Sequence, residues 1–330
     1  MAERAVELIG GSVTDKTKKN YENAVAKFEF FRSLSGIRKR DCRPPSDSTI
    51  TCWIAWLSGE DQKLGLQTIR TYLSGLTKKM HWRGYLSTSE SLAVRPLTKQ
   101  CLEGLERQLA RRPSNDKQKL AREPLSFAML EQVQASLPLP DQRSYTERMM
   151  FAAMTLTLAG GFRAGEIFPC EGQKGLSFSC LTPLNESLNR VEPANASLYK
   201  VRLITSKAKQ KEAVEVPIAI PLAVKAVTDY LSVRPLSSPS SPLFLTQAGL
   251  PLARTSFVSS TRIYLSRAGV NGVSKIYGHS FRLGMAQELR DAGHDDTTIK
   301  RYGRWKSTAH LRYHKDSLRT LADVGRSVKK

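Results

Sequence analysis

The sequence predicts a two-domain protein that is mostly α-helical, with a small antiparallel β-sheet in the second domain. Three observations predict this fold class. In both halves of the 330-residue chain, apolar residues recur at intervals of three and four, the pattern of helices with one buried face. Around residues 201–220 they alternate with polar residues instead, as in strands. The polar, proline-bounded stretch 111–124 shows neither pattern and separates the two halves.

The first domain, residues 1–112, is expected to contain four helices. The first helix begins after Thr14, whose side chain suits an N-cap, and the turn-rich stretch 43–47 precedes the second helix. The apolar residues that mark the four helices are Tyr21, Ala24, Val25, Phe28, Phe31, Ile50, Trp53, Ile54, Leu57, Ile69, Tyr72, Leu73, Leu76, Leu102, Leu105 and Leu109.

Cations and aromatic rings are interleaved just after the third helix. Lys78, Lys79 and Arg83 flank His81 and Trp82 there, so the three cations are candidate contacts for DNA backbone phosphates. The alternative is an ordinary helix end whose Trp82 packs inward. The sequence fits both interpretations.

We predict a linker at residues 113–123 and a second domain at residues 124–330. Two buried helices are expected first, the second of them ending at Gly160-Gly161. The alternating stretches then flank a lysine-rich segment, which predicts a β-hairpin with a charged tip at 206–212. The helices expected in this domain cover 125–137, 146–158, 224–231, 255–268, 281–292, 297–302 and 317–328.

The charge of the chain predicts a polyanionic partner. Its 51 Lys and Arg outnumber 30 Asp and Glu, which gives a formal net charge of +21. Residues 1–123 hold 23 cations against 14 anions, and residues 124–330 hold 28 against 16, so both domains are expected to contact nucleic acid. A solvated basic surface is the alternative. Because no apolar run approaches the roughly 18 residues of a membrane span, we expect a soluble, intracellular protein without a membrane partner.

Three segments of the second domain carry candidate catalytic side chains. In the first, Arg163 stands at a helix-turn junction with Glu166 three residues on. In the second, His279 and Arg282 share one face of a helical turn. In the third, the motif Gly303-Arg304-Trp305 places Trp305 eight residues before Tyr313.

Such an inventory suits attack on a phosphodiester without a metal. Forked guanidiniums can hold the charge that grows on the non-bridging oxygens, where another enzyme would use Mg²⁺. A tyrosine hydroxyl among cations can act as the nucleophile, and a lysine on the hairpin tip can protonate the leaving oxygen. The five cysteines form no C-x2-C pair and no carboxylate cluster is obvious, so neither a metal nor another cofactor is expected. Taken singly, each candidate also has an ordinary structural explanation.

In this order, Gly-Phe-Arg-x-x-Glu-Ile, a hairpin lysine, Gly-His-x-x-Arg, Gly-Arg-Trp and a tyrosine resemble the tyrosine recombinase (phage integrase-like) family over roughly residues 124–325. In detail, 278–282 and 303–313 are most similar to the recombinases of eukaryotic mobile elements, the Crypton and DIRS-like groups. The resemblance implies the fold of that family, with a helical core-binding domain at 1–112 that clamps DNA and an α+β catalytic domain at 124–330.

The resemblance also implies roles for individual residues. Tyr313 would form a 3′-phosphotyrosyl bond and expel a 5′-hydroxyl, while Arg163 and Arg282 would clamp the scissile phosphate. His279 would be the neighbouring acid/base group, and Trp305 would support the phosphate.

Two further assignments follow from the same resemblance. Glu166 matches the acidic position that supports the first arginine or the neighbouring histidine. Lys207 fits the general acid best, although Lys209 and Lys211 are close enough to compete and are candidate DNA contacts. The eight-residue spacing from Trp305 departs from the nine residues of many bacterial members, which the loop before Tyr313 would have to absorb.

The function implied is a site-specific recombinase, or transposase, that cleaves and rejoins double-stranded DNA of a mobile element. It would act as a homo-tetramer on two DNA sites and be a monomer or dimer without DNA. Two alternatives stay open: a DNA-binding protein derived from a recombinase without strand exchange, and a type IB topoisomerase-like enzyme. The nucleus is the expected location, or the cytoplasm if the source is bacterial.

Overall fold

The computed structural model describes residues 11–111, 123–170, 174–204, 213–235 and 237–305. The chain divides into two compact units, Met1–Asp116 and Lys117–Lys330. The point of division falls within the stretch 113–123. The expected domain boundaries themselves stay a prediction, and the two units are described separately below.

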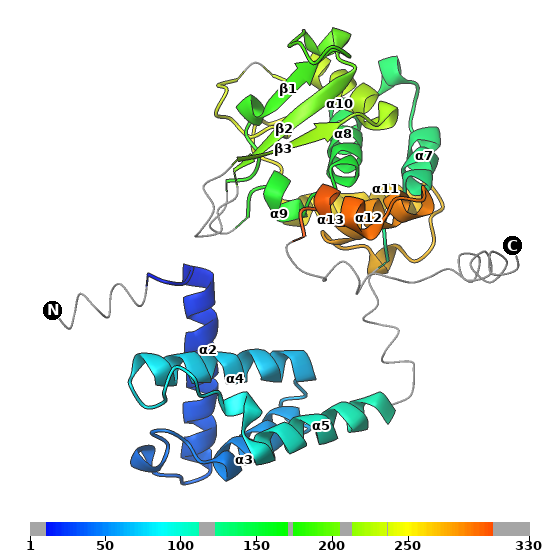
Figure 1. Cartoon of the computed structure of the whole chain (residues 1–330). Helices are drawn as coiled ribbons and strands as arrows, with labels where there is room; N and C mark the ends of the chain where they lie inside the picture. The colour runs from blue at the N-terminus through cyan, green and yellow to red at the C-terminus, as the bar shows by residue number, and fades with distance from the viewer. Residues whose placement is uncertain (1–10, 112–122, 171–173, 205–212, 236, 306–330) are drawn as a thin grey trace, which may run out of the picture. The chain divides into compact units, whose positions relative to one another are not determined.

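The first unit consists of helices, as predicted (Figure 1). Its α-helices are α2 (Asp15–Leu34), α3 (Asp47–Ser58), α4 (Leu66–Trp82) and α5 (Pro96–Arg111), and its short 3-10 helices are η1 (Lys39–Asp41) and η2 (Leu92–Val94). The Thr14 side chain accepts a hydrogen bond from the Thr17 N–H and caps α2, as expected. Of the sixteen predicted core positions, four are only partly buried: Tyr21, Val25, Tyr72 and Leu109.

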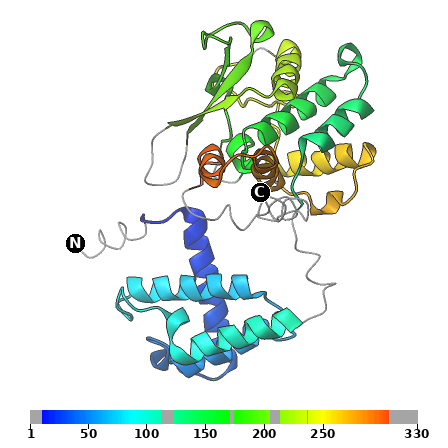
Figure 2. The same cartoon turned by 45° about the vertical axis from the view of Figure 1, so that its right-hand side comes forward.

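The second unit combines helices with a small sheet (Figures 1 and 2). Its α-helices are α7 (Phe127–Ser136), α8 (Tyr145–Ala159), α9 (Ala164–Ile167), α10 (Pro221–Val233), α11 (Arg254–Arg267), α12 (Ser280–Asp291) and α13 (Asp296–Tyr302). Its 3-10 helices are η3 (Pro140–Gln142), η4 (Phe178–Cys180), η5 (Pro193–Asn195) and η6 (Val273–Lys275). The hairpin tip at 206–212 and the helix expected at 317–328 lie outside the described residues. Among the helices that are described, none has both the length and the apolar character to cross a membrane.

The sheet has three antiparallel strands in the order β1-β2-β3: β1 (Leu181–Leu184), β2 (Leu198–Ile204) and β3 (Ala213–Ile218). The predicted hairpin is β2 and β3, in which Val201 pairs with Val216. The sequence analysis missed β1, because four residues that include Pro183 are too short to show alternation. It also extended the last strand to Ile220, which instead caps α10, since Pro221 is the first residue of that helix.

Helix α8 is the centre of the second unit. Every residue from Met149 to Ala159 is buried, so this helix lacks a solvent-exposed face in its second half. The helices α7, α10, α11 and α12 all pack against it, and Figure 2 shows α7, α8 and α11 side by side. The Ser144 and Glu147 side chains close a capping box at its start. Where α8 ends, the chain therefore leaves a rigid core at a fixed position.

Helix α12 approaches the chain before α7 very closely. The Leu125 N–H donates to the Ser280 carbonyl oxygen at 3.1 Å. A Cβ atom at Gly284 would lie 1.6 Å from the Leu125 carbonyl oxygen, which is backbone and cannot turn aside. Glycine at 284 is therefore required for this contact, which holds the helix that carries Arg282.

Replacing Gly284 tests this close approach. We expect Gly284→Ala to lower the free energy of unfolding by about 1–3 kcal/mol or more, the cost of overpacking a core. Gly104→Ala is the matched control, because Gly104 lies inside helix α5 with open space around its Cα. That variant should gain about 0.5–1 kcal/mol from helix propensity. Urea denaturation of the full chain, followed by circular dichroism, measures both, and an unchanged Gly284→Ala transition would contradict the packing.

Candidate active site

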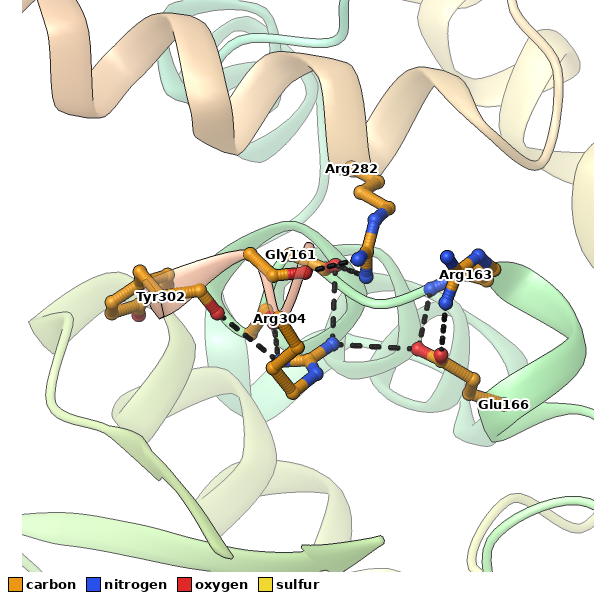
Figure 3. Close-up of polar contacts among 8 residues, drawn as sticks. Gly161, Arg163, Glu166, Arg282, Tyr302 and Arg304 are labelled. Carbon is orange, nitrogen blue, oxygen red and sulfur yellow. Dashed lines mark hydrogen bonds and ion pairs between the residues drawn. The ribbon is translucent and has the colours of Figure 1, made fainter. Parts of the chain in front are cut away.

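Arg163 and Glu166 form the outer part of the site (Figure 3). Two glycines and Phe162 follow α8, and Arg163 then occupies the N-cap position of the short helix α9. Its backbone N–H donates to Glu166 Oε2 at 2.9 Å, and its Nη1 donates to Glu166 Oε1 at 2.7 Å. The Arg163 side chain is 46% exposed. The two side chains are thus in contact, and this leaves much of the Arg163 side chain open to a ligand.

Arg282 forms the inner part of the site. It lies in the first turn of α12 and is fully buried. Its Nη1 donates to the Gly161 carbonyl oxygen at 3.2 Å, and its Nη2 donates to the Gly303 carbonyl oxygen. Its guanidinium carbon lies 4.6 Å from the centroid of the Trp305 ring, a cation–π distance. Arg282 thus joins α12 to the glycine turn after α8 and to the turn after α13.

Arg304 connects these two parts, and the sequence analysis gave it no role. Its Nη2 donates to Glu166 Oε2 at 3.4 Å and to the Gly161 carbonyl oxygen at 3.3 Å. Its Nη1 donates to the Gly160 carbonyl oxygen at 3.0 Å. Figure 3 shows the resulting chain of contacts from Arg163 through Glu166 and Arg304 to Gly161 and Arg282.

The turn after α13 sets the direction of both Arg304 and Trp305. Gly303 ends the helix, and Arg304 follows with a φ of 56°, in the left-handed region that few non-glycine residues adopt. The backbone N–H of Trp305 donates to the Lys300 carbonyl oxygen at 3.0 Å. A Cβ atom at Gly303 would lie 1.5 Å from the Trp305 ring, so only glycine lets the ring fold back over Arg282.

The charges of the site favour an ionised Glu166. Burial raises the pKa of Glu166, but the charge of Arg304, the Arg163 N–H and the charges of Arg163 and Arg282 outweigh burial and hold its pKa below the ordinary value. Burial lowers the pKa of Arg304, and Glu166 opposes that shift. Three guanidiniums thus surround one carboxylate, which leaves an excess of positive charge for an anion.

A basic groove lies beside Arg163. His279 lines it from the start of α12, and Arg254 and Arg262 line it from α11. The Ala164 N–H donates to the Gly278 carbonyl oxygen at 3.2 Å, which joins the Arg163 and His279 segments. Figure 1 shows α9, α11, α12 and α13 at the same end of the unit.

The sequence analysis missed Arg254 and Arg262. The groove-lining residues of α11 are Arg254, Thr255, Val258, Ser259 and Arg262, which recur along one helix face at alternating intervals of one and three. The mostly polar character of that face was the available signal. The sequence predicts one shared face for His279 and Arg282, but the structure separates them. His279 is the N-cap of α12 and lines the groove, whereas Arg282 lies in the first turn and points into the protein.

Four predicted site residues lie outside the described residues. They are Lys207, Lys209, Lys211 and Tyr313. Their roles as general acid, DNA contacts and nucleophile therefore stay predictions. Across the ranges that are described, no group of three or more His, Cys, Asp and Glu residues is placed to hold a metal ion.

Two of the three cations of the first unit are placed differently from our expectation. Helix α4 continues to Trp82, so Lys78 and Lys79 lie inside it and not after it, whereas Arg83 follows the helix as its C-cap. The reason is that Met80 continues the buried face of the helix. The Lys79 ammonium lies 5.1 Å from the Trp82 ring centroid and 3.9 Å from Glu22. Lys78 and Arg83 are exposed and stay candidates for phosphate contact.

Glu166→Gln tests the charge network. Because the pKa of Glu166 lies below its ordinary value in the folded protein, its ionised form stabilises the fold above that value, and this contribution disappears as the pH falls through the folded-state pKa. At neutral pH we expect a loss of about 1.5–3 kcal/mol, the value of hydrogen bonds to a charged group. The difference from the wild type should shrink as the pH falls below 4.5.

Urea denaturation across this pH range measures the effect. Glu131→Gln, on an exposed position of α7, is the matched control and should change little at any pH. A difference for Glu166→Gln that stays constant down to acidic pH would show that the charge of Glu166 does not stabilise the fold.

Comparison with solved structures shows the fold. The XerH site-specific recombinase bound to palindromic difH substrate has a TM-score of 0.62 at 14% identity, over 94% of this chain and 80% of that chain. The Tn1549 transposon integrase in complex with transposon right end DNA has a TM-score of 0.59 at 13% identity, over 98% and 99%. A lambda integrase tetramer bound to a Holliday junction has a TM-score of 0.54 at 14% identity, over 95% and 76%.

The sequence itself matches no curated protein. A sequence model of the phage integrase family, however, matches residues 128–319, which is more than half of the chain and includes the segments of Arg163, Arg282 and Trp305. The architecture of helices with a small three-stranded antiparallel sheet is the tyrosine recombinase fold that the sequence predicted. The chain therefore belongs to the phage integrase family of tyrosine recombinases.

Proposed function

We propose that this recombinase cleaves and rejoins DNA through a 3′-phosphotyrosyl intermediate on Tyr313, without a metal ion. The observation that carries the proposal is the joint fixation of Arg163 and Arg282. Both guanidiniums are held by one contact network beside a basic groove. Two fixed cations can stabilise the charge that develops on the non-bridging oxygens of a phosphodiester under attack.

The two arginines would bind the scissile phosphate in different ways. Arg163 is exposed and can meet the phosphate as DNA enters the groove. Arg282 is fully buried before DNA binds, and its guanidinium donates to the carbonyl oxygens of Gly161 and Gly303. Its contact with a phosphate therefore requires the chain around it to shift. Trp305, which lies against the Arg282 guanidinium, would support that position.

The reaction itself would be a transesterification. The Tyr313 oxygen attacks phosphorus, the new Tyr313 O–P bond forms, and the P–O5′ bond breaks. His279 would accept the proton of the tyrosine hydroxyl, and Lys207, or its neighbours Lys209 and Lys211, would protonate the leaving 5′ oxygen. The phosphotyrosine conserves the energy of the broken bond, so a 5′-hydroxyl from a second duplex can reseal the strand without a cofactor.

Strand exchange would take place in a tetramer that holds two DNA sites. Exchange of strands between duplexes requires two cleavage sites held together, and the lambda integrase of similar fold is a tetramer bound to a Holliday junction. The net charge of +21 and the exposed Lys78 and Arg83 supply sequence-independent attraction to the DNA backbone.

Mobile-element DNA is the proposed substrate. The support is the likeness of 278–282 and 303–313 to Crypton and DIRS-like recombinases, together with the fold shared with the Tn1549 transposon integrase. If the element is eukaryotic, the protein would act in the nucleus.

Covalent capture tests this function. The wild type is incubated in EDTA with nicked duplexes from the ends of the element, and a denaturing gel is examined for a protein–DNA adduct. We expect an adduct that Tyr313→Phe abolishes, because the variant lacks the attacking oxygen. Tyr302→Phe is the matched control and should keep the adduct, since the Tyr302 hydroxyl is already bonded to the Ala159 carbonyl oxygen at 2.6 Å.

Addition of a second duplex distinguishes a recombinase from a topoisomerase. A recombinase joins the captured strand to the second duplex, whereas a topoisomerase-like enzyme reseals only the strand that it cut. DNA binding without an adduct in the wild type would contradict the proposal and favour a DNA-binding protein.

A further inference from the structure

We propose that Arg304 is a positioning residue that fixes both phosphate-binding arginines at once. The inference rests on the proposed function, because it assigns the purpose of a buried cation within the same site. The motif Gly303-Arg304-Trp305 contributed only its tryptophan to the sequence-based assignment, whereas among the described residues Arg304 donates to four oxygen atoms.

Arg304 shares one hydrogen-bond acceptor with each of the two arginines. Glu166 accepts from Arg163 through Oε1 and from Arg304 through Oε2. The Gly161 carbonyl oxygen accepts from Arg282 and from Arg304, at 3.2 Å and 3.3 Å. Displacement of the Arg304 side chain would therefore disturb the anchor of each arginine at the same time. Glu166 and Gly161 belong to one short segment, so the two anchors also move together.

Burial separates Arg304 from the ligand. Its side chain is 14% exposed, against 46% for Arg163, and it is absent from the groove that Arg163 and His279 line. Within the described part of the chain, its polar contacts are to Glu166 and to the backbone carbonyl oxygens of 160, 161 and 302. It acts on the phosphate through its neighbours and does not touch it.

Arginine is required at this position by geometry. Nη1 donates to the Gly160 and Tyr302 carbonyl oxygens, while Nη2 donates to Gly161 and Glu166, so the two branches of the fork point to different segments. The single nitrogen of a lysine cannot span them. The guanidinium also lies 5.0 Å from the ring centroid of the fully buried Phe162, which fixes its plane.

The spacing between Arg304 and Tyr313 suggests a different role for Arg304, direct contact with the phosphate, which the structure does not favour. Arg304 stands nine residues before Tyr313, and Trp305 stands eight before it. Nine is the spacing of the supporting His or Trp in many bacterial members, so Arg304 could be assigned to the phosphate by counting. The structure turns Arg304 toward Glu166 and places Trp305 against Arg282.

A phosphate-interference experiment tests the proposal without any chemistry. Arg304→Asn is introduced in the Tyr313→Phe background, because asparagine tolerates the left-handed backbone but carries no charge. Binding is measured on a duplex that the purified Tyr313→Phe protein selects from a random library. A neutral methylphosphonate then replaces each phosphate of the duplex in turn. Arg301→Gln is the matched control, since it removes a cation from an exposed position of α13 next to Arg304.

We expect one phosphate whose neutralisation weakens binding of the parent about 10-fold or more, as for charge-assisted hydrogen bonds from two guanidiniums. In Arg304→Asn this penalty should fall to about 3-fold or less, because the contact is already lost on the unmodified duplex, while the penalties at all other phosphates are little changed. The Arg301→Gln protein should keep the full penalty. An Arg304→Asn protein that keeps it as well would overturn the proposal.

Arg304→Lys is a second test of the proposal, and it can be used even if the asparagine variant does not fold. It keeps the charge and loses the fork, so we expect it to lose most of the penalty while its unfolding transition stays close to that of the parent. If Arg304→Lys kept the full loss of affinity on methylphosphonate substitution, the charge at position 304 alone would be sufficient. That result would contradict the geometric argument.

The same measurement separates this inference from the proposed function. A parent protein that shows no sensitive phosphate would contradict the phosphate clamp itself, and with it the role of Arg304. A sensitive phosphate in the parent that persists in both Arg304 variants would leave the clamp intact and reject the positioning role alone.

Discussion

The Glu166 carboxylate lies between the guanidiniums of Arg163 and Arg304, and the geometry of the site depends on this shared contact. Like charges that are brought this close repel one another, so a site that collects cations for a phosphate needs an internal anion to hold it together before the ligand arrives. Burial alone would favour a neutral Glu166, but the surrounding positive charge lowers its pKa and keeps it ionised. One carboxylate among three arginines orders the side chains and still leaves positive charge to bind an anion.

The scaffold makes this contact possible by bringing distant segments together. Helix α8 is buried along its second half, so the glycine turn that follows it is fixed by the core. Gly161, with φ of 54°, presents its carbonyl oxygen to both Arg282 and Arg304. The close approach at Gly284 holds the helix that carries Arg282. Each element contributes one or two groups, and the site exists only where the turns after α8 and α13 meet the start of α12.

The sequence predicted what is local and missed what depends on contacts between distant segments. The helical periods placed the longer α-helices described but not the four-residue α9, and alternation placed the hairpin of β2 and β3, because burial of one face imposes those periods. The short strand β1 carries too few residues for such a signal. Arg163 with Glu166 could be predicted because the two residues are three apart. The role of Arg304 could not, since its acceptors at Gly160 and Glu166 are 144 and 138 residues away along the chain. The groove face of α11 could not be predicted either, because its position beside His279 depends on the packing of distant segments.

The structure of the Tyr313→Phe protein bound to its DNA would test the central claim most directly. The account predicts that the non-bridging oxygens of one phosphate accept hydrogen bonds from both Arg163 and Arg282, at about 2.7–2.9 Å, with the ring at position 313 facing the same phosphorus. It also predicts that Glu166 and Arg304 keep their mutual contact behind that phosphate. A DNA backbone that follows the groove of Arg254 and Arg262 but brings no phosphate within hydrogen-bond distance of both Arg163 and Arg282 would contradict it.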